Sequence, residues 1–260
     1  MIDVRTTLLK LPYSEKKERK KVVADYYFYK GKCIDPELAK ADKIFLGQNW
    51  EVNDNVDYIP AQDIRNKVKP LLKKQARFMF GKEPDVILKP DNTKDKDSCE
   101  ELRMFIDNIF ESNHFWKNTR KAFLMSTVKK RVLLRLEANP DMPIIIKYEN
   151  IEDFYYKEQN GNLLEVRFFE EDEGNVFKTS DTDKIYYVHI YYYDHEREEA
   201  EVQAYYKKLT FKGDNLETPI KEESQPTGFN NLPCWLIVNG GELGDDFGES
   251  DVEELRDSQN

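Results

Sequence analysis

An acidic, glycine-rich stretch near the end of the chain holds the residue types best suited to chemistry. Gly244, Asp245 and Asp246 follow an expected strand, and paired carboxylates bind two Mg²⁺ ions in nucleotide-polymerising enzymes. The sequence supplies neither a second carboxylate strand nor a triphosphate-binding set beside them. The plainer interpretation is that these acids precede a helix whose N-terminal dipole favours negative charge. A metal-dependent nucleic-acid-processing enzyme of a mobile element is therefore kept as the alternative function.

The three histidines, His114, His189 and His195, are the next candidates for metal binding or acid–base work. None has HExxH spacing, and metal sites need several ligands that converge. The chain also lacks a GxxxxGK[ST] phosphate loop, a GxGxxG dinucleotide fingerprint and a GxSxG nucleophile elbow. We therefore predict a protein without catalytic residues, bound metal or cofactor.

A set of tyrosines in two expected strands allows two interpretations. The set comprises Tyr186, Tyr187, Tyr191, Tyr192, Tyr193, Tyr205 and Tyr206. Such rings can stack on nucleic-acid bases, but that use needs an accompanying basic groove. Tyrosine also suits the two faces of a sheet. No basic groove is evident, so we predict that the rings pack a sheet.

The balance of charge opposes tight contact with nucleic acid. Fifty acidic residues against 40 basic ones give a net charge of −10, whereas phosphate-binding domains usually have a basic excess. We expect at most weak, salt-sensitive DNA binding. Only a local basic patch, at residues 16–21 or 69–74, could overcome the repulsion between DNA and the net negative charge of the protein. The first of these is interleaved with Glu15 and Glu18, as a solvated helix face would be.

Compartment signals are few. Cys33, Cys99 and Cys234 lie far apart, so we expect reduced thiols rather than a disulfide framework. The first residues lack the layout of a signal peptide. No apolar run approaches the roughly 20 residues that span a bilayer. We expect assembly in a cytoplasm and no membrane partner.

The hydrophobic pattern predicts helices first. Expected helices cover about 14–30, 60–80, 98–112 and 115–129, and we expect Pro70 to kink the second of them. Residues 33–58 are expected to form a long loop, and 86–88 a short strand. Residues 219–231 are expected to form a polar loop.

From residue 131 the period becomes that of strands. Strands are expected at 131–136, 144–148, 154–157, 163–169, 185–193, 202–211 and 234–238, and Asn160-Gly161 is a strong hairpin signal. Helices followed by an antiparallel sheet define an α+β fold. We divide the chain into a helical part at 1–129, a β-rich part at 130–246 and the start of a further helix at 247–260.

That last helix begins at a well-formed cap. Ser250 is the expected N-cap, acids fill the first turn, and Leu255 faces inward. The pattern stops without a helix-ending signal, so we expect the natural chain to continue. About ten residues are too few to hold an isolated helix in water. We therefore expect this segment to be frayed, or held only by contacts with other molecules, and the chain to be mainly monomeric.

Four segments together resemble the portal proteins of tailed phages, of the type found in siphophages and prophages of Gram-positive bacteria. They are YYFYKG at 26–31, ARFMFGKEP at 76–84, IYYY at 190–193, and NLPCW at 231–235 leading into GESDVEEL at 248–255. The last motif is the most specific of them. Its candidate residues, which we name the stem-start motif, are Gly248, Glu249, Ser250, Asp251, Val252 and Leu255.

The resemblance implies a structural protein of the virion rather than an enzyme. It places this chain in the wing of the portal, with the helix from Ser250 running on into the stem. Family members form a twelve-subunit ring at one capsid vertex, through which double-stranded DNA enters and leaves without sequence-specific binding. Implied partners are other copies of the chain, the terminase, the capsid and the head–tail connector proteins.

Overall fold

The computed structural model describes residues 4–30, 67–90, 96–139, 142–193, 203–241, 247–253 and 255. The chain forms two compact units, each discontinuous in sequence. Residues 1–19 and 133–236 make one, which we call the sheet unit. Residues 20–132 and 237–260 make the other, the helix unit. The three-part division proposed from the sequence follows chain order and stays a prediction.

Four of the described helices fall within or within two residues of the predicted ranges, and α1 was not predicted. They are α1 (Val4–Leu8), α2 (Tyr13–Lys30), α4 (Val68–Met79), α5 (Lys96–Ser112) and α6 (Phe115–Lys129), with 3₁₀ turns at Glu173–Phe177 and Asp181–Asp183. Pro70 lies in the first turn of α4, where a missing N–H leaves no helical bond unmade, so the predicted kink is wrong for the described helix. Residues 33–58, the expected loop, lie outside the described residues.

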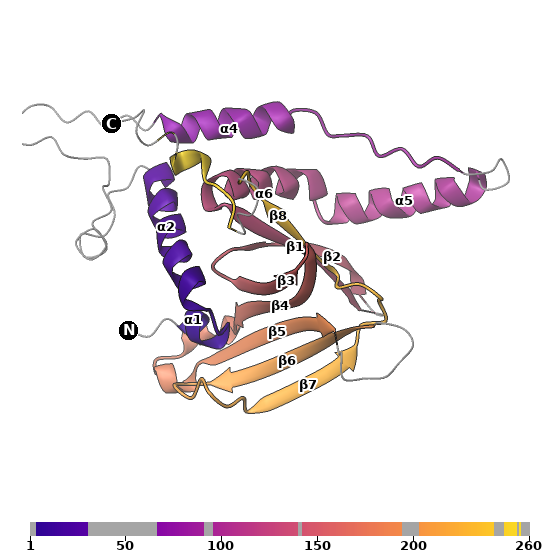
Figure 1. The fold of residues 1–260 in the computed structure, drawn as a ribbon. Coiled ribbons are helices and arrows are strands. Elements are labelled where there is room, and N and C mark those ends of the chain that lie inside the picture. The colour runs from indigo at the N-terminus through magenta and orange to yellow at the C-terminus, as the bar shows by residue number, and fades with distance from the viewer. Residues whose placement is uncertain are drawn as a thin grey trace, which may run out of the picture. The chain divides into compact units, whose positions relative to one another are not determined.

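The described strands that follow number eight. They form two sheets (Figure 1). They are β1 (Arg131–Asn139), β2 (Met142–Asn150), β3 (Phe154–Gln159), β4 (Asn162–Glu171), β5 (Ile185–Tyr193), β6 (Ala204–Lys212), β7 (Lys221–Pro226) and β8 (Cys234–Val238). One sheet has the order β2-β1-β8, and the other runs β3-β4-β5-β6-β7 with each neighbour antiparallel. The α+β prediction is confirmed.

Two local predictions are wrong. Residues 86–88 form no strand, and the side chain of Ile87 is 73% exposed with no described strand beside it. Residues 221–226 form a strand where a loop was expected, because Lys221 to Pro226 pair with β6. Every residue of β7 is exposed, so this edge strand has no apolar alternation by which the sequence could reveal it.

Each unit has its own apolar core. In the sheet unit, Leu8, Leu9 and Leu11 pack with Phe169, Tyr186, Val188 and Phe211. In the helix unit, Phe28 and Tyr29 of α2 pack with Val68 and Leu72 of α4, Val128 of α6 and Val252. The second core therefore includes one residue of the stem-start motif.

Candidate functional site

The stem-start motif lies entirely in the helix unit, and its six residues are all described. Residues 251–253 and 255 are helical. Ser250 caps this helix, as the sequence predicts. Its Oγ accepts a hydrogen bond from the Val252 N–H at 3.3 Å, and its carbonyl accepts one from the Glu253 N–H at 2.9 Å. Both bonds satisfy amide donors that a helix start otherwise leaves without partners.

The same hydroxyl ties the cap to α6. Ser250 Oγ donates to the carbonyl of Val128 at 2.9 Å, and the residue is only 1% exposed. Val128 is close to the C-terminal end of α6, where carbonyls lack helical donors. One buried side chain therefore completes the end of one helix and the beginning of the next.

Asn239 holds the motif from the other side. Its side-chain amide donates to the Glu249 carbonyl at 2.9 Å and to Asp251 Oδ1 at 2.8 Å. Its backbone accepts from the Glu249 N–H and donates to the Lys130 carbonyl, both at 2.8 Å. Asn239 is not one of the motif's candidate residues, and no pattern in the sequence around it signals this role.

Gly248 is required by the close approach of the chain at this point. Its φ is +71°, in the left-handed region that favours glycine. A Cβ here would lie 2.6 Å from Val238 Cγ1 and 2.9 Å from the Asn239 carbonyl oxygen. Neither the backbone conformation nor the space admits a side chain.

Apolar packing completes the anchoring. Val252 is fully buried, and Leu255 packs against the same core as a partly buried residue. The ammonium of Lys130 lies 3.6 Å from Glu253 Oε2, and the Arg131 guanidinium lies over the Phe247 ring at 5.1 Å. The expectation that this segment is frayed or held only from outside is therefore wrong for the described residues, because contacts within the chain hold it.

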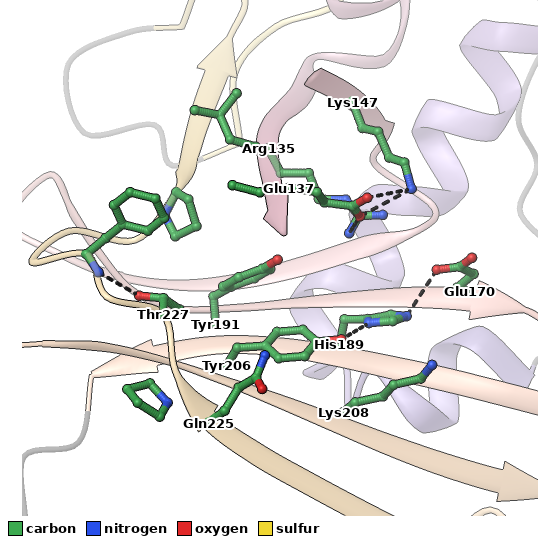
Figure 2. Close-up of a pocket in the computed structure, with 15 residues that line it drawn as sticks. Arg135, Glu137, Lys147, Glu170, His189, Tyr191, Tyr206, Lys208, Gln225 and Thr227 are labelled. Atoms are coloured by element: carbon green, nitrogen blue, oxygen red, sulfur yellow. Dashed lines mark hydrogen bonds and ion pairs between the residues drawn. The ribbon is translucent and has the colours of Figure 1, made fainter. Parts of the chain in front are cut away.

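A second feature is a polar pocket of about 570 Å³ in the sheet unit (Figure 2). Its floor carries a relay of polar contacts across three strands, with a hydrogen bond on one side of His189 and a close carboxylate contact on the other. His189 Nδ1 lies 2.7 Å from the Tyr206 hydroxyl, and His189 Nε2 lies 3.0 Å from Glu170 Oε2. This geometry fits the tautomer in which Nδ1 accepts from Tyr206 and Nε2–H faces the carboxylate.

Arg135 of β1 lines the same pocket. Its Nε donates to Glu149 Oε1 at 2.7 Å, it pairs with Glu137, and its guanidinium lies 4.8 Å above the Phe168 ring. Burial lowers the pKa of this guanidinium, but the carboxylates of Glu149 and Glu137 more than offset that effect and raise it. Arg135 therefore stays positively charged and holds its carboxylate partners, and it does not act as a general acid.

The pKa shifts of the pocket's carboxylate and phenols favour a structural role over acid–base catalysis. The hydrogen bond from His189 lowers the pKa of Glu170 to about 2. Burial raises the pKa of Tyr206 to about 12, and burial also raises that of Tyr191. Phenols held this firmly in the protonated form are poor nucleophiles at neutral pH.

Among the described residues, His114 and the buried tyrosines lie outside any catalytic arrangement. His114 is exposed and precedes α6, while His195 lies outside the described residues. Tyr186, Tyr191 and Tyr205 are each at most 7% exposed. These three rings pack the sheet, as predicted.

The Gly244-Asp245-Asp246 turn lies outside the described residues. Among the residues that the structure does describe, no group of three or more His, Cys, Asp or Glu side chains could hold a metal ion. No helix in that same part of the chain is long and apolar enough to cross a membrane.

Comparison with known proteins identifies the class. Residues 8–260 match the sequence profile of a family of phage portal proteins. The family is described as phage portal protein, SPP1 Gp6-like, and because the match covers nearly the whole chain, the chain belongs to it. The resemblance drawn from the motifs is confirmed at this level. No curated protein matches the chain.

Proposed function

We propose that this protein is a structural subunit of the portal ring at one capsid vertex of a tailed phage or prophage, of the siphophage type of Gram-positive bacteria. Membership of the portal family over residues 8–260 carries the proposal. In this role the chain contributes to the wing of the portal. Copies assemble in the bacterial host cytoplasm, and the finished ring resides in the virion.

The ring is proposed to contain twelve copies, joined through a heterologous interface, the kind that generates cyclic symmetry. Its central channel passes double-stranded DNA during packaging and ejection. The terminase, the capsid and the head–tail connector proteins are its other partners. The anchored stem-start motif supports this arrangement, since Ser250, Asn239 and Val252 give the following helix a fixed starting direction.

Immunogold electron microscopy of virions tests the location. Antibodies raised against the chain should label a single vertex of emptied particles, where the tail attaches. Labelling spread over the capsid or along the tail would contradict the portal assignment. A matching genetic test is loss of DNA-filled heads, with intact capsid and tail proteins, when the gene is interrupted.

The protein is proposed to perform no catalysis, and the energy for packaging is left to a separate motor. The competing reading, a metal-dependent nucleic-acid-processing enzyme, has its own test. Titration calorimetry with Mg²⁺ and a nuclease assay should both be blank. Magnesium-dependent activity that disappears in Asp245→Asn/Asp246→Asn would establish the competing reading.

A further inference from the structure

Positive charge is concentrated on two helices of the helix unit. Between them α4 and α6 carry eight lysine and arginine residues and no aspartate or glutamate. Neighbouring α5 carries five acids and two bases, and the whole chain has a net charge of −10. The charge of α4 and α6 is therefore opposite to that of the protein as a whole.

The core fixes how α4 presents its cations. Val68, Leu72 and Ala76 are at most 3% exposed and hold one face of the helix against the core. On the adjoining stripe Lys69, Lys73 and Arg77 recur every four residues, a rise of about 6 Å per step. Together with Lys74 and Pro70 they line a shallow hollow of about 340 Å³.

Three of these cations have no acidic neighbour among the residues that the structure describes. Lys73, Lys74 and Arg77 are exposed, and within the described ranges no carboxylate lies at ion-pair distance from any of them. Within the described part of the chain, the fixed helix therefore presents cations that are not paired with carboxylates. Counterions of this kind are released when a polyanion binds.

The adjacent helix extends the cationic surface. α6 packs on α4, with Phe80 against Phe123 at a ring separation of 5.5 Å. Lys117, Arg120 and Lys121 are exposed along α6 and have no ion-pair partner in the described part of the chain. They are spaced three and four residues apart, so they share one helix face.

The other lysine-rich segment of the chain is different. Along α2, Lys16 and Lys17 alternate with Glu15 and Glu18, and Arg19 pairs with Glu15 at 3.0 Å. That segment carries acids of its own to offset its charge, whereas the α4 sequence contains none. Of the two basic segments predicted from the sequence, α4 is therefore the better candidate for binding a polyanion.

We propose that α4, with α6, is a contact surface for the phosphate backbone of double-stranded DNA, independent of base sequence. The surface supplies point charges at regular spacing and no element that could read base edges. Its affinity is set by three or four phosphate contacts working against an acidic protein, so we expect a Kd roughly in the range 10⁻⁶–10⁻⁴ M. The charge and burial of α4 and α6 define this surface independently of the portal assignment.

Fluorescence anisotropy of the whole chain with a labelled duplex of about 24 base pairs tests the proposal over a salt series. The logarithm of the association constant should fall with the logarithm of salt with a slope of about −3. Duplexes of unrelated sequence should bind equally. Lys73→Glu/Lys74→Glu/Arg77→Glu should weaken binding at low salt by at least about tenfold.

The matched control is Lys16→Glu/Lys17→Glu/Lys20→Glu. Each triple change lowers the net charge by six from −10, so the two variants differ only in where the charge changes. The control should lose less than about threefold. If both variants lose the same affinity for DNA, the effect comes from the net charge of the protein and the proposal is overturned. Absence of binding by the wild type at low salt would also overturn it.

Circular dichroism checks that the variants fold. If the reversed charges unfold α4, Lys73→Gln/Lys74→Gln/Arg77→Gln replaces them, and its salt slope should be shallower than the wild-type slope by about 2 to 3. An unchanged slope would place the contacts elsewhere. Strong binding to heparin with none to duplex DNA would show a docking surface for another polyanion and would likewise overturn the proposal.

Discussion

At the scale of single residues, Gly248 combines two separate constraints, a positive φ and a crowded Cβ position. Gly248→Ala should therefore destabilise the protein by about 3 kcal/mol, from left-handed strain and overpacking together. Gly161→Ala is the matched control. Gly161 has a φ of +79° but nothing within 4 Å of its Cβ position, so only strain applies, about 1 kcal/mol. Urea unfolding followed by far-ultraviolet circular dichroism measures both, and equal losses would show that the Val238 contact is unimportant.

Ser250 is a helix cap that also satisfies a buried carbonyl. Ser250→Ala should cost about 2 kcal/mol, since it removes the cap and leaves the Val128 carbonyl without its donor. Ser180 gives the comparison, because its hydroxyl caps a 3₁₀ turn in the same way but is exposed. Ser180→Ala should cost about 0.5 kcal/mol. The loss of unfolding free energy in Ser250→Ala, minus the loss in Ser180→Ala, reports the contribution of the buried hydrogen bond to Val128.

Glu170 gives the sheet unit a pH dependence of defined sign. Its pKa is lowered from 4.5 to about 2, first by the hydrogen bond from His189. The ionised Glu170 carboxylate therefore contributes its full amount to the free energy of unfolding above about pH 4.5. That contribution is lost as the pH falls toward 2.

Glu170→Gln should flatten the dependence of unfolding free energy on pH within that window, as measured by urea unfolding at successive pH values. Tyr206→Phe removes the hydroxyl on the other side of His189 and leaves the carboxylate, so it should keep the wild-type slope. If Glu170→Gln also keeps that slope, the contact between Glu170 and His189 does not form in solution.

At the scale of elements, Val252 anchors the helix that Ser250 begins. Val252 is fully buried in the core that α2, α4 and α6 share. Val252→Ala should cost about 2 kcal/mol, from lost burial and the cavity that remains. Val176→Ala makes the same chemical change at a side chain that is 85% exposed and should stay within about 0.5 kcal/mol. A Val252→Ala protein as stable as the wild type would mean that this helix start is detached in solution.

Elements with a clear apolar period could be predicted from the sequence, and those without one could not. α5 begins within two residues of its predicted start and ends at its predicted end, because Leu102, Phe105 and Ile109 recur at helical spacing. β7 was missed because every one of its side chains is exposed, and only pairing with β6 makes it a strand. Residues 86–88 show the reverse, since an apolar run that pairs with no described strand forms no strand.

The candidate site divides in the same way. Ser250 and the acids that follow it could be read locally, because a cap acts within its own turn. The bonds from Ser250 to Val128 and from Asn239 to Asp251 could not, because they join residues 122 and 12 positions apart. The relay of His189 depends on the register of three strands, which spacing along the chain does not reveal.

At the scale of the whole molecule, neither compact unit is continuous in sequence. The sheet unit takes its first 19 residues from the N-terminus and the rest from 133–236. Leu8, Leu9 and Leu11 are at most 6% exposed and lie in the core with Phe169 and its neighbours. The N-terminal segment therefore completes the core of a sheet that begins more than a hundred residues later.

This arrangement makes Leu9 a test of the unit as a whole. Leu9→Ala should cost about 3 kcal/mol, because the side chain is fully buried among Phe169, Tyr186 and Val188. Leu71→Ala, at a position that is 50% exposed, should cost less than about 1 kcal/mol. Near-ultraviolet circular dichroism follows the tyrosine-rich sheet during urea unfolding, and limited proteolysis shows where the weakened chain opens. New cleavage should appear within 133–236 rather than at the N-terminus alone, because removing one leucine opens the core that the distant strands share. Cleavage confined to the first residues, with an unchanged sheet signal, would show that the N-terminal segment lies on the sheet without completing its core.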